Sequence, residues 1–76
     1  MNDKRRKRLQ EACMYIESAS DIVESVLDDE RDALDNVPEN LQQSERYSSI
    51  EDAVCALEYA YDSLGSALGD VQTAIG

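Results

Sequence analysis

Histidine, tryptophan and phenylalanine are absent from this 76-residue sequence, and proline occurs only once. Without histidine, the chain cannot form a catalytic triad, a proton relay or a metal site that depends on an imidazole. A glycine-rich phosphate-binding loop is missing as well. We therefore expect no enzymatic activity, no cofactor and no metal site. Any core must be aliphatic, with the four tyrosines in support.

Long apolar runs and paired cysteines are also missing. No run of about 20 apolar residues is present that could span a bilayer. The segment that follows the basic start is too polar for the apolar part of a signal peptide. Cys13 and Cys55 are too few for a disulfide framework. These absences predict a cytoplasmic protein that does not associate with membranes.

Basic residues are scarce and lie mostly at the start of the chain. Five of the seven form a basic N-terminal arm within residues 1–8: Lys4, Arg5, Arg6, Lys7 and Arg8. In residues 9–76, only Arg31 and Arg46 oppose sixteen acids, which gives this single predicted domain a formal charge of −14. Such a body repels nucleic acid and attracts basic partners. The arm itself either contacts nucleic acid or another acidic surface, or neutralises a helix C-terminus beside it.

Apolar residues recur every three or four positions in the first half of the chain. The stripe consists of Leu9, Ile16 and Val23, then Ala12, Ala19, Val26 and Ala33 three residues later, flanked by Cys13, Ser20, Leu27 and Leu34. This spacing predicts an amphipathic helix over about residues 4–35.

The second half repeats the pattern without interruption. Its three registers hold Ile50, Leu57, Leu64 and Val71, then Ala53, Ala60, Ala67 and Ala74, flanked by Val54, Tyr61, Leu68 and Ile75. Ser48 and Glu51 have the spacing of a capping box. These features predict a second helix over about residues 49–75.

Alanine recurs at seven-residue spacing in both helices, with Val26 in its place once on the first helix, which indicates close packing of the two backbones. The alternative is that alanine is there only because it favours helix. We predict an all-α fold, an antiparallel two-helix hairpin with Alacoil-like coiled-coil packing. Apolar flanks formed by Tyr15, Ile22, Tyr61 and Ile75 predict that two hairpins form a homodimer, a four-helix bundle.

The predicted connection, residues 36–48, contains apolar residues in an otherwise polar segment. Asn36 tolerates the left-handed conformation that often ends a helix. Pro38 suits the first position of a short helical turn. Val37, Leu41 and Tyr47 can fold back onto the open end of the hairpin. We expect a capped, ordered turn.

Acidic residues form a ladder on the first helix. The ladder consists of Glu17, Asp21, Glu24, Asp28 and Asp32, and Asp29 and Glu30 widen it. Like charges three or four residues apart destabilise a helix, so an ordinary solvated face would mix signs. One interpretation is that the ladder imitates the charges of a nucleic-acid backbone. The other is an ordinary acidic surface that keeps the protein soluble.

The connection also carries a family resemblance. The segment ALDNVPENLQQSERYSSIEDAV, residues 33–54, is followed by ALEYAYDSLGSAL. Together they resemble small acidic helical-hairpin proteins of bacterial phages and mobile elements, in which an A-x-DN-x-PENLQ-x-SER connection joins two amphipathic helices. The matching residues are Ala33, Asp35, Asn36, Pro38 to Gln42 and Ser44 to Arg46. The resemblance covers about residues 28–70 and implies a bacterial host cell, but no activity.

Three functions are compatible with these observations. The first is an inhibitor or modulator of a host nucleic-acid-binding protein, such as a CRISPR nuclease or another defence enzyme, whose basic groove the acidic face occupies as a DNA mimic. The second is a self-assembling structural or adaptor module. The third is a nucleic-acid-associated accessory protein that uses residues 4–8.

Overall fold

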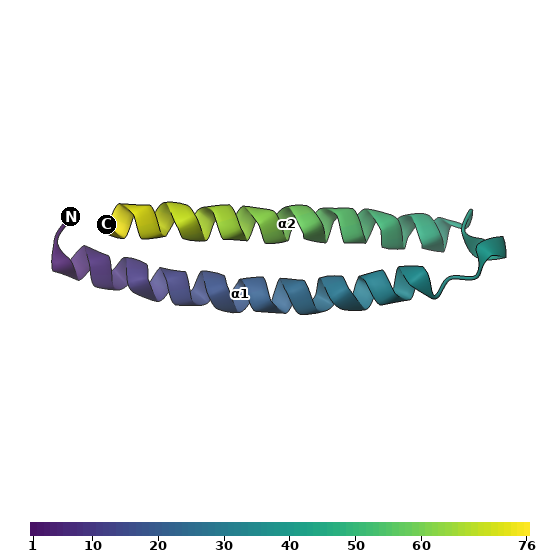
Figure 1. The fold of residues 1–76 in the computed structure, drawn as a ribbon, viewed down its shortest axis with the longest axis horizontal. Helices are drawn as coiled ribbons and strands as arrows, with labels where there is room; N and C mark the ends of the chain where they lie inside the picture. Colours follow the sequence, from purple (N-terminus) through teal and green to yellow (C-terminus); the bar gives the residue numbers. More distant parts are fainter.

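Two long helices account for most of the chain. In the computed structural model, which describes all residues from Met1 to Gly76, α1 runs from Asp3 to Asp35 and α2 from Glu45 to Ile75. A short 3-10 helix, η1, lies between them at Glu39–Leu41, and there is no strand. The helices pack side by side as an antiparallel hairpin with both termini at one end (Figure 1). The predicted all-α hairpin is confirmed.

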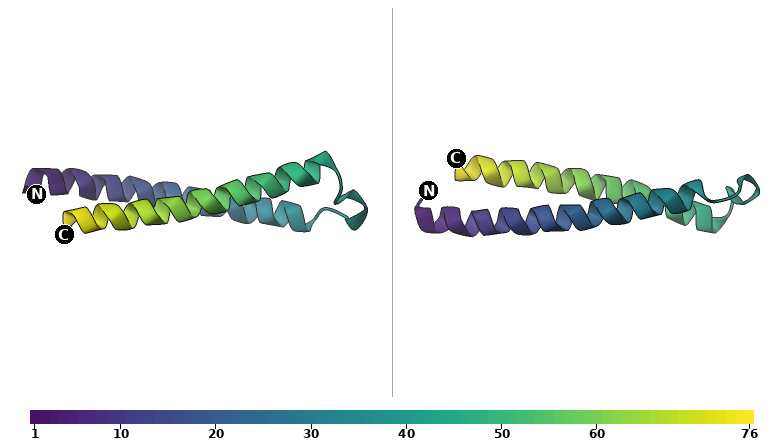
Figure 2. Two further views of the ribbon diagram at one scale, coloured as in Figure 1. Left: turned by 90° about the horizontal axis from the view of Figure 1, so that it is seen from above. Right: turned by 60° about the horizontal axis from the view of Figure 1, so that its bottom comes forward.

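The hairpin is a thin rod, with Cα extents of 59 × 14 × 14 Å. The two views in Figure 2 show α1 and α2 crossing at a shallow angle. A heptad repeat produces such a crossing because 3.5 residues per repeat differ slightly from the 3.6 residues per turn of a straight helix.

The first helix begins with a side-chain cap and includes the basic arm. The Asn2 side-chain oxygen accepts a hydrogen bond from the Arg5 backbone N–H at 2.9 Å, which satisfies one of the free donors of the first turn. Residues 4–8 therefore belong to the first two turns of α1. At the other end, Asn36 adopts φ −90° and ψ −1°, so the helix ends without the left-handed residue that the sequence allowed there.

The second helix begins four residues earlier than the sequence predicts. Ser44 caps it, because its side-chain oxygen accepts from the Tyr47 backbone N–H at 3.2 Å. Ser48 and Glu51 consequently lie inside the helix, and the predicted capping box is not the helix start. The physical reason is that Tyr47 lies seven residues before Val54 and extends the apolar stripe by one turn.

The seam between the helices is narrow. Only three residues are buried, namely Cys13, Leu27 and Val54, and no side chain is completely enclosed. The larger aliphatic residues of both heptads line the rest of the seam and are half-buried. Two helices thus bury one stripe each and leave both long sides of the rod open to solvent.

Alanine lies at the edge of this seam on α1, not at its centre. The deepest α1 residues, Cys13 and Leu27, come from the register that the sequence places beside the alanines. Ala12 and Ala19 are half-buried, and Ala33 is exposed. On α2, the corresponding residues Ala53, Ala60 and Ala67 are half-buried.

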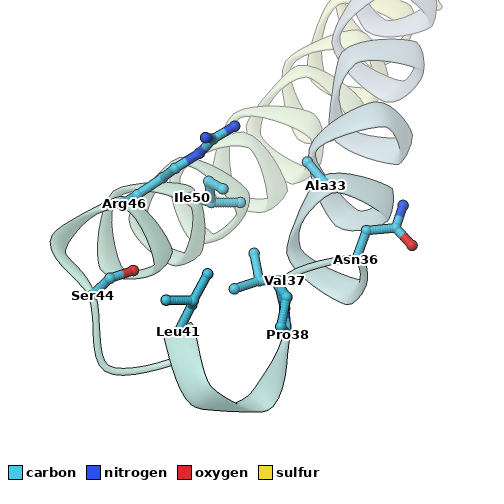
Figure 3. Close-up of a pocket in the computed structure, with 8 residues that line it drawn as sticks. All are labelled: Ala33, Asn36, Val37, Pro38, Leu41, Ser44, Arg46 and Ile50. Carbon is cyan, nitrogen blue, oxygen red and sulfur yellow. The ribbon is translucent and has the colours of Figure 1, made fainter.

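The connection forms an ordered turn of residues 36–44. Pro38 has φ −58° and ψ 147° and precedes η1 as its cap, instead of occupying its first position, and its carbonyl accepts from the Leu41 N–H at 2.9 Å. Figure 3 shows Val37, Leu41 and Ile50 gathered around a cavity of about 330 Å³ at this end of the rod. Val37 is half-buried, whereas Leu41 remains exposed.

Candidate partner-binding sides of the hairpin

The acidic ladder predicted on α1 occupies one long side of the rod. Four of its residues, all exposed, form its main row: Glu17, Asp21, Glu24 and Asp28. Successive members are three or four residues apart, so they follow one line along the helix surface. At a rise of 1.5 Å per residue, the line is about 16 Å long.

Contacts across the seam show which part of α2 shares this side. Arg31 of α1 lies 3.6 Å from the Glu58 carboxylate of α2. The Glu24 carboxylate of α1 raises the pKa of Tyr61 of α2, so these two residues share one side. Glu58 and Asp62, which flank Tyr61, therefore join the α1 ladder. We define the acidic side as Glu17, Asp21, Glu24 and Asp28 of α1 with Glu58 and Asp62 of α2.

Tyr61 reports the negative potential of the acidic side. Hydrogen bonding to the Glu24 carboxylate, together with the charge of that group, raises the pKa of Tyr61 above its ordinary value of 10.0. The charges of Asp21 and Asp62 act in the same direction. Ionised tyrosine would add one more negative charge to a side that already carries several.

Arg31 is a basic residue that forms ion pairs with two carboxylates of the acidic side. It lies 3.7 Å from Asp28 and 3.6 Å from Glu58, and all three side chains are well exposed. Exposed ion pairs of this kind contribute little stability. The other carboxylates of the acidic side form no ion pair, so most of their charge faces solvent unopposed.

One residue predicted to belong to the ladder, Asp29, lies on another side of the helix. Asp29 follows Asp28 by one residue, or about 100° around the axis. It lies seven residues after Ile22 and shares the side of the rod to which Ile22 belongs. Asp32 follows Asp28 by four residues, the spacing that also joins Glu17 to Asp21 and Glu24 to Asp28, and stays a predicted member of the ladder. The register of α1 thus separates Asp29 from the line of Glu17, Asp21, Glu24 and Asp28.

The opposite side of the rod is apolar. Tyr15, Ile22 and Val26 are exposed there on α1, with Ile22 leaving 65% of its surface accessible. Heptad register places a row of small residues from both helices around them. We define the apolar side as these three residues with Ala12, Ala19 and Ala33 of α1 and Ala53, Ala56, Ala60, Ser63, Ala67 and Ala74 of α2.

The apolar side lacks charge along its middle. On α1 its flanking charges are Glu11, which accepts a hydrogen bond from the Tyr15 hydroxyl at 3.2 Å, and Asp29. On α2 the nearest acids are Asp70, which shares the register of Ala56 and Ser63, and Asp52, which precedes Ala53. Two flank residues predicted from sequence are not part of it: Tyr61 is on the acidic side, and Ile75 is half-buried at the chain end.

The basic arm divides its residues between two environments. The Arg6 Nε donates to the Ile75 carbonyl at 3.1 Å, at the C-terminal end of α2, where a cation is favoured by the helix dipole. Arg6 also pairs with Asp3 at 3.3 Å. The other four cations, Lys4, Arg5, Lys7 and Arg8, form no ion pair in the structure. Neutralisation of the helix end thus occupies one residue of the five.

No protein-family model, curated protein or solved structure matches the chain. The resemblance of the connection to phage hairpin proteins therefore stays a prediction.

Neither helix is apolar enough over a sufficient length to cross a bilayer. No three cysteine or acidic side chains lie close enough together to hold a metal ion.

Proposed function

We propose that this hairpin is a non-enzymatic binding protein whose acidic side occupies the basic surface of a nucleic-acid-binding protein. The observation that carries the proposal is the alignment of carboxylates from both helices on one exposed side of the rod. A ladder on α1 alone would be a single row, whereas Glu58 and Asp62 add a second row across the seam.

The density of charge on this side supports the proposal. The acidic side places six carboxylates along about 16 Å of rod, or roughly one charge per 3 Å. A single nucleic-acid strand carries one phosphate per 3.4 Å of helix axis, and a duplex one per 1.7 Å. The acidic side therefore presents roughly the charge of a single strand to a groove that binds phosphates.

The stability of the hairpin does not account for this arrangement. Neighbouring like charges on a helix face oppose folding by about 0.2–0.5 kcal/mol per pair. The same acids interspersed with basic residues would make the protein equally soluble without that loss. A basic partner surface reverses the sign of the effect, because each carboxylate then has an opposite charge nearby.

The class of partner follows from the chemistry of the acidic side. Lysine- and arginine-lined grooves that track a phosphate backbone are typical of nucleic-acid-binding proteins. The resemblance to phage hairpin proteins directs the search to bacterial defence nucleases, which carry such grooves.

The test is a charge reversal with a matched control. The variant Asp21→Lys/Glu24→Lys/Asp28→Lys changes the acidic side, and Glu39→Lys/Glu45→Lys/Asp52→Lys makes the same change in net charge elsewhere. Immobilised wild-type protein and the control variant should retain a DNA-binding protein from a bacterial extract, and free duplex DNA should release it. The acidic-side variant should retain none, while circular dichroism shows unchanged helicity. Retention by that variant, or failure of DNA to compete, would contradict the proposal.

A further inference from the structure

The isolated hairpin exposes more surface than a protein of its size normally does. Its accessible surface is 5784 Å². A compact monomer of the same mass, 8.5 kDa, exposes about 4,700 Å². The excess of about 1,100 Å² is close to what one subunit loses in a standard protein interface, about 800 Å² per partner.

One long side of the rod has the right area for such an interface. The rod measures 59 × 14 Å across its Cα atoms, so one side offers about 800 Å², the share of one partner in a standard interface. The two long sides differ in what their burial requires. Covering the acidic side with a like surface would strip water from unpaired carboxylates, which carries a penalty of several kcal/mol per ion. Covering the apolar side removes Tyr15, Ile22 and Val26 from water and traps no charge along its middle.

We propose that the apolar side is the contact between two copies of this chain, packed antiparallel about a twofold axis close to Ile22. In this homodimer α1 packs on α1 of the other copy through Tyr15, Ile22 and Val26, and the small residues of α2 let the two α2 helices approach closely. The four helices then enclose one core, and the acidic sides of both copies face outward. The inference stands apart from the proposed function, because it concerns the opposite side of the rod.

The orientation follows from the uneven distribution of charge along the rod. The turn end, residues 28–52, contains nine acids against Arg31 and Arg46. The other end carries the basic arm, where four cations have no ion-pair partner. A parallel dimer would place acidic turn against acidic turn, whereas an antiparallel dimer places the arm of each copy against the turn of the other. Complementary potentials favour the antiparallel register.

The apolar residues at the two ends agree with this register. Met1 and Leu41 are both exposed, and they lie 21 and 19 residues from Ile22 on opposite sides of it. Met1, Arg5 and Arg8 line one hollow at the arm end. Leu41, Val37 and Arg46 are among the residues that line the cavity at the turn end, about 330 Å³ in volume (Figure 3). The single cation Arg46 is outnumbered by the acids of residues 28–52 around it. Antiparallel packing brings these two surfaces together twice, once at each end of the dimer.

Two substitutions of equal exposure test the interface. Ile22 and Met14 are 65% and 67% exposed on α1, but Met14 lies outside the apolar side. Because a residue near a twofold axis meets its own copy, Ile22→Glu should raise the dimer dissociation constant by at least about 100-fold. Met14→Glu should leave the dissociation constant within a few-fold of the wild-type value. Sedimentation equilibrium between 1 and 200 μM measures both.

A second measurement is needed if the Ile22→Glu variant is too unstable for its molar mass to be determined by sedimentation. The melting temperature of a protein that folds as a dimer rises with concentration. Wild type and Met14→Glu should show this rise, and Ile22→Glu should not. A wild-type chain that sediments as a monomer at 200 μM would overturn the proposal. So would an Ile22→Glu variant that dimerises as tightly as wild type.

Orientation is measured with a spin label at the turn. The label is attached to Asn40→Cys in a chain in which Cys13→Ala and Cys55→Ser remove the native thiols. Antiparallel packing about Ile22 separates the two labels by about 45 Å or more, from the helix rise. Parallel packing would bring the labels within about 20 Å, since packed helix axes are 8–10 Å apart. A short distance would overturn the antiparallel register.

Discussion

The acidic side and the apolar side of the hairpin are formed by the same two helices, yet one is charged and the other is apolar. On the acidic side, each helix contributes carboxylates, and Arg31 pairs across the seam with Glu58 while the pKa of Tyr61 responds to Glu24. The remaining polar contact between the helices, from Arg6 to the Ile75 carbonyl, lies at the chain ends. On the apolar side, no polar group links the helices, and large side chains stand exposed between small ones. The acidic side is suited to contact with water, whereas the apolar side has the composition of one half of a hydrophobic core.

This difference shows why the two sides should be perturbed by different means. Charge on the acidic side responds to salt and to substitution by neutral isosteres of similar size. Area on the apolar side responds to protein concentration, because only a second molecule can cover it.

The largest expected effect separates the seam from the apolar side. Leu27 is 3% exposed, and its neighbour Val26 is 44% exposed. Leu27→Ala leaves a cavity in the seam and should lower the free energy of unfolding by about 2–4 kcal/mol at any protein concentration. Val26→Ala should lower it by less than about 1 kcal/mol for dilute protein, and by more at concentrations where the copies associate. Urea unfolding at 1 and 100 μM measures both.

Equal losses for the two variants in dilute protein would contradict the seam described above. If the loss of unfolding free energy in Val26→Ala does not depend on protein concentration, the proposal that a second copy covers the apolar side is contradicted.

A smaller effect is expected on the acidic side, with the opposite sign. Replacing Glu17 with Gln and Asp21 with Asn removes two like-charge pairs on α1. The free energy of unfolding should rise by about 0.4–1 kcal/mol. Salt provides the control, because 1 M sodium chloride should stabilise wild type by a similar amount and the double variant by less. A double variant that is less stable than wild type would show that these acids stabilise the fold itself.

The smallest effect is spectroscopic and concerns Tyr61. The difference in absorbance near 295 nm between wild type and Tyr61→Phe isolates its ionisation, which should occur above pH 10.0 because Glu24 raises the pKa. The stabilisation linked to the raised pKa is complete below pH 10 and is lost as the pH rises through the folded-state value. Glu24→Gln should lower the pKa toward its ordinary value. An unchanged midpoint in that variant would mean that Glu24 does not contact Tyr61.

The helices and their antiparallel packing could be predicted because both heptad patterns are long and unbroken. The start of α2 could not, because Ser44 and Ser48 are both acceptable caps and only Tyr47 packing into the stripe decides between them. The spacing of residues along one helix also predicts which of them are neighbours on that helix, but not which residues of the other helix lie beside them. It identified Glu24 and Asp28, but the pairing of Glu58 and Tyr61 with them depends on the register between the helices.

The predicted flanks illustrate the same limit. Tyr15 and Ile22 belong to the apolar side, as their spacing indicates. Tyr61 has the same apolar character by sequence, yet it lies across the rod beside Glu24. A heptad pattern states how far a residue is from the seam, and not on which side of the seam it lies. Polar contacts across the seam supply that information.

Sedimentation equilibrium of three chains tests the division between the two sides most directly. The chains are wild type, Ile22→Glu and the acidic-side variant Asp21→Lys/Glu24→Lys/Asp28→Lys. Wild type and the acidic-side variant should both sediment as dimers, at twice the chain mass of 8.5 kDa. Ile22→Glu should sediment as a monomer, at the mass of one chain. A dimer that survives Ile22→Glu but dissociates when the acids are reversed would contradict the assignment of the two sides.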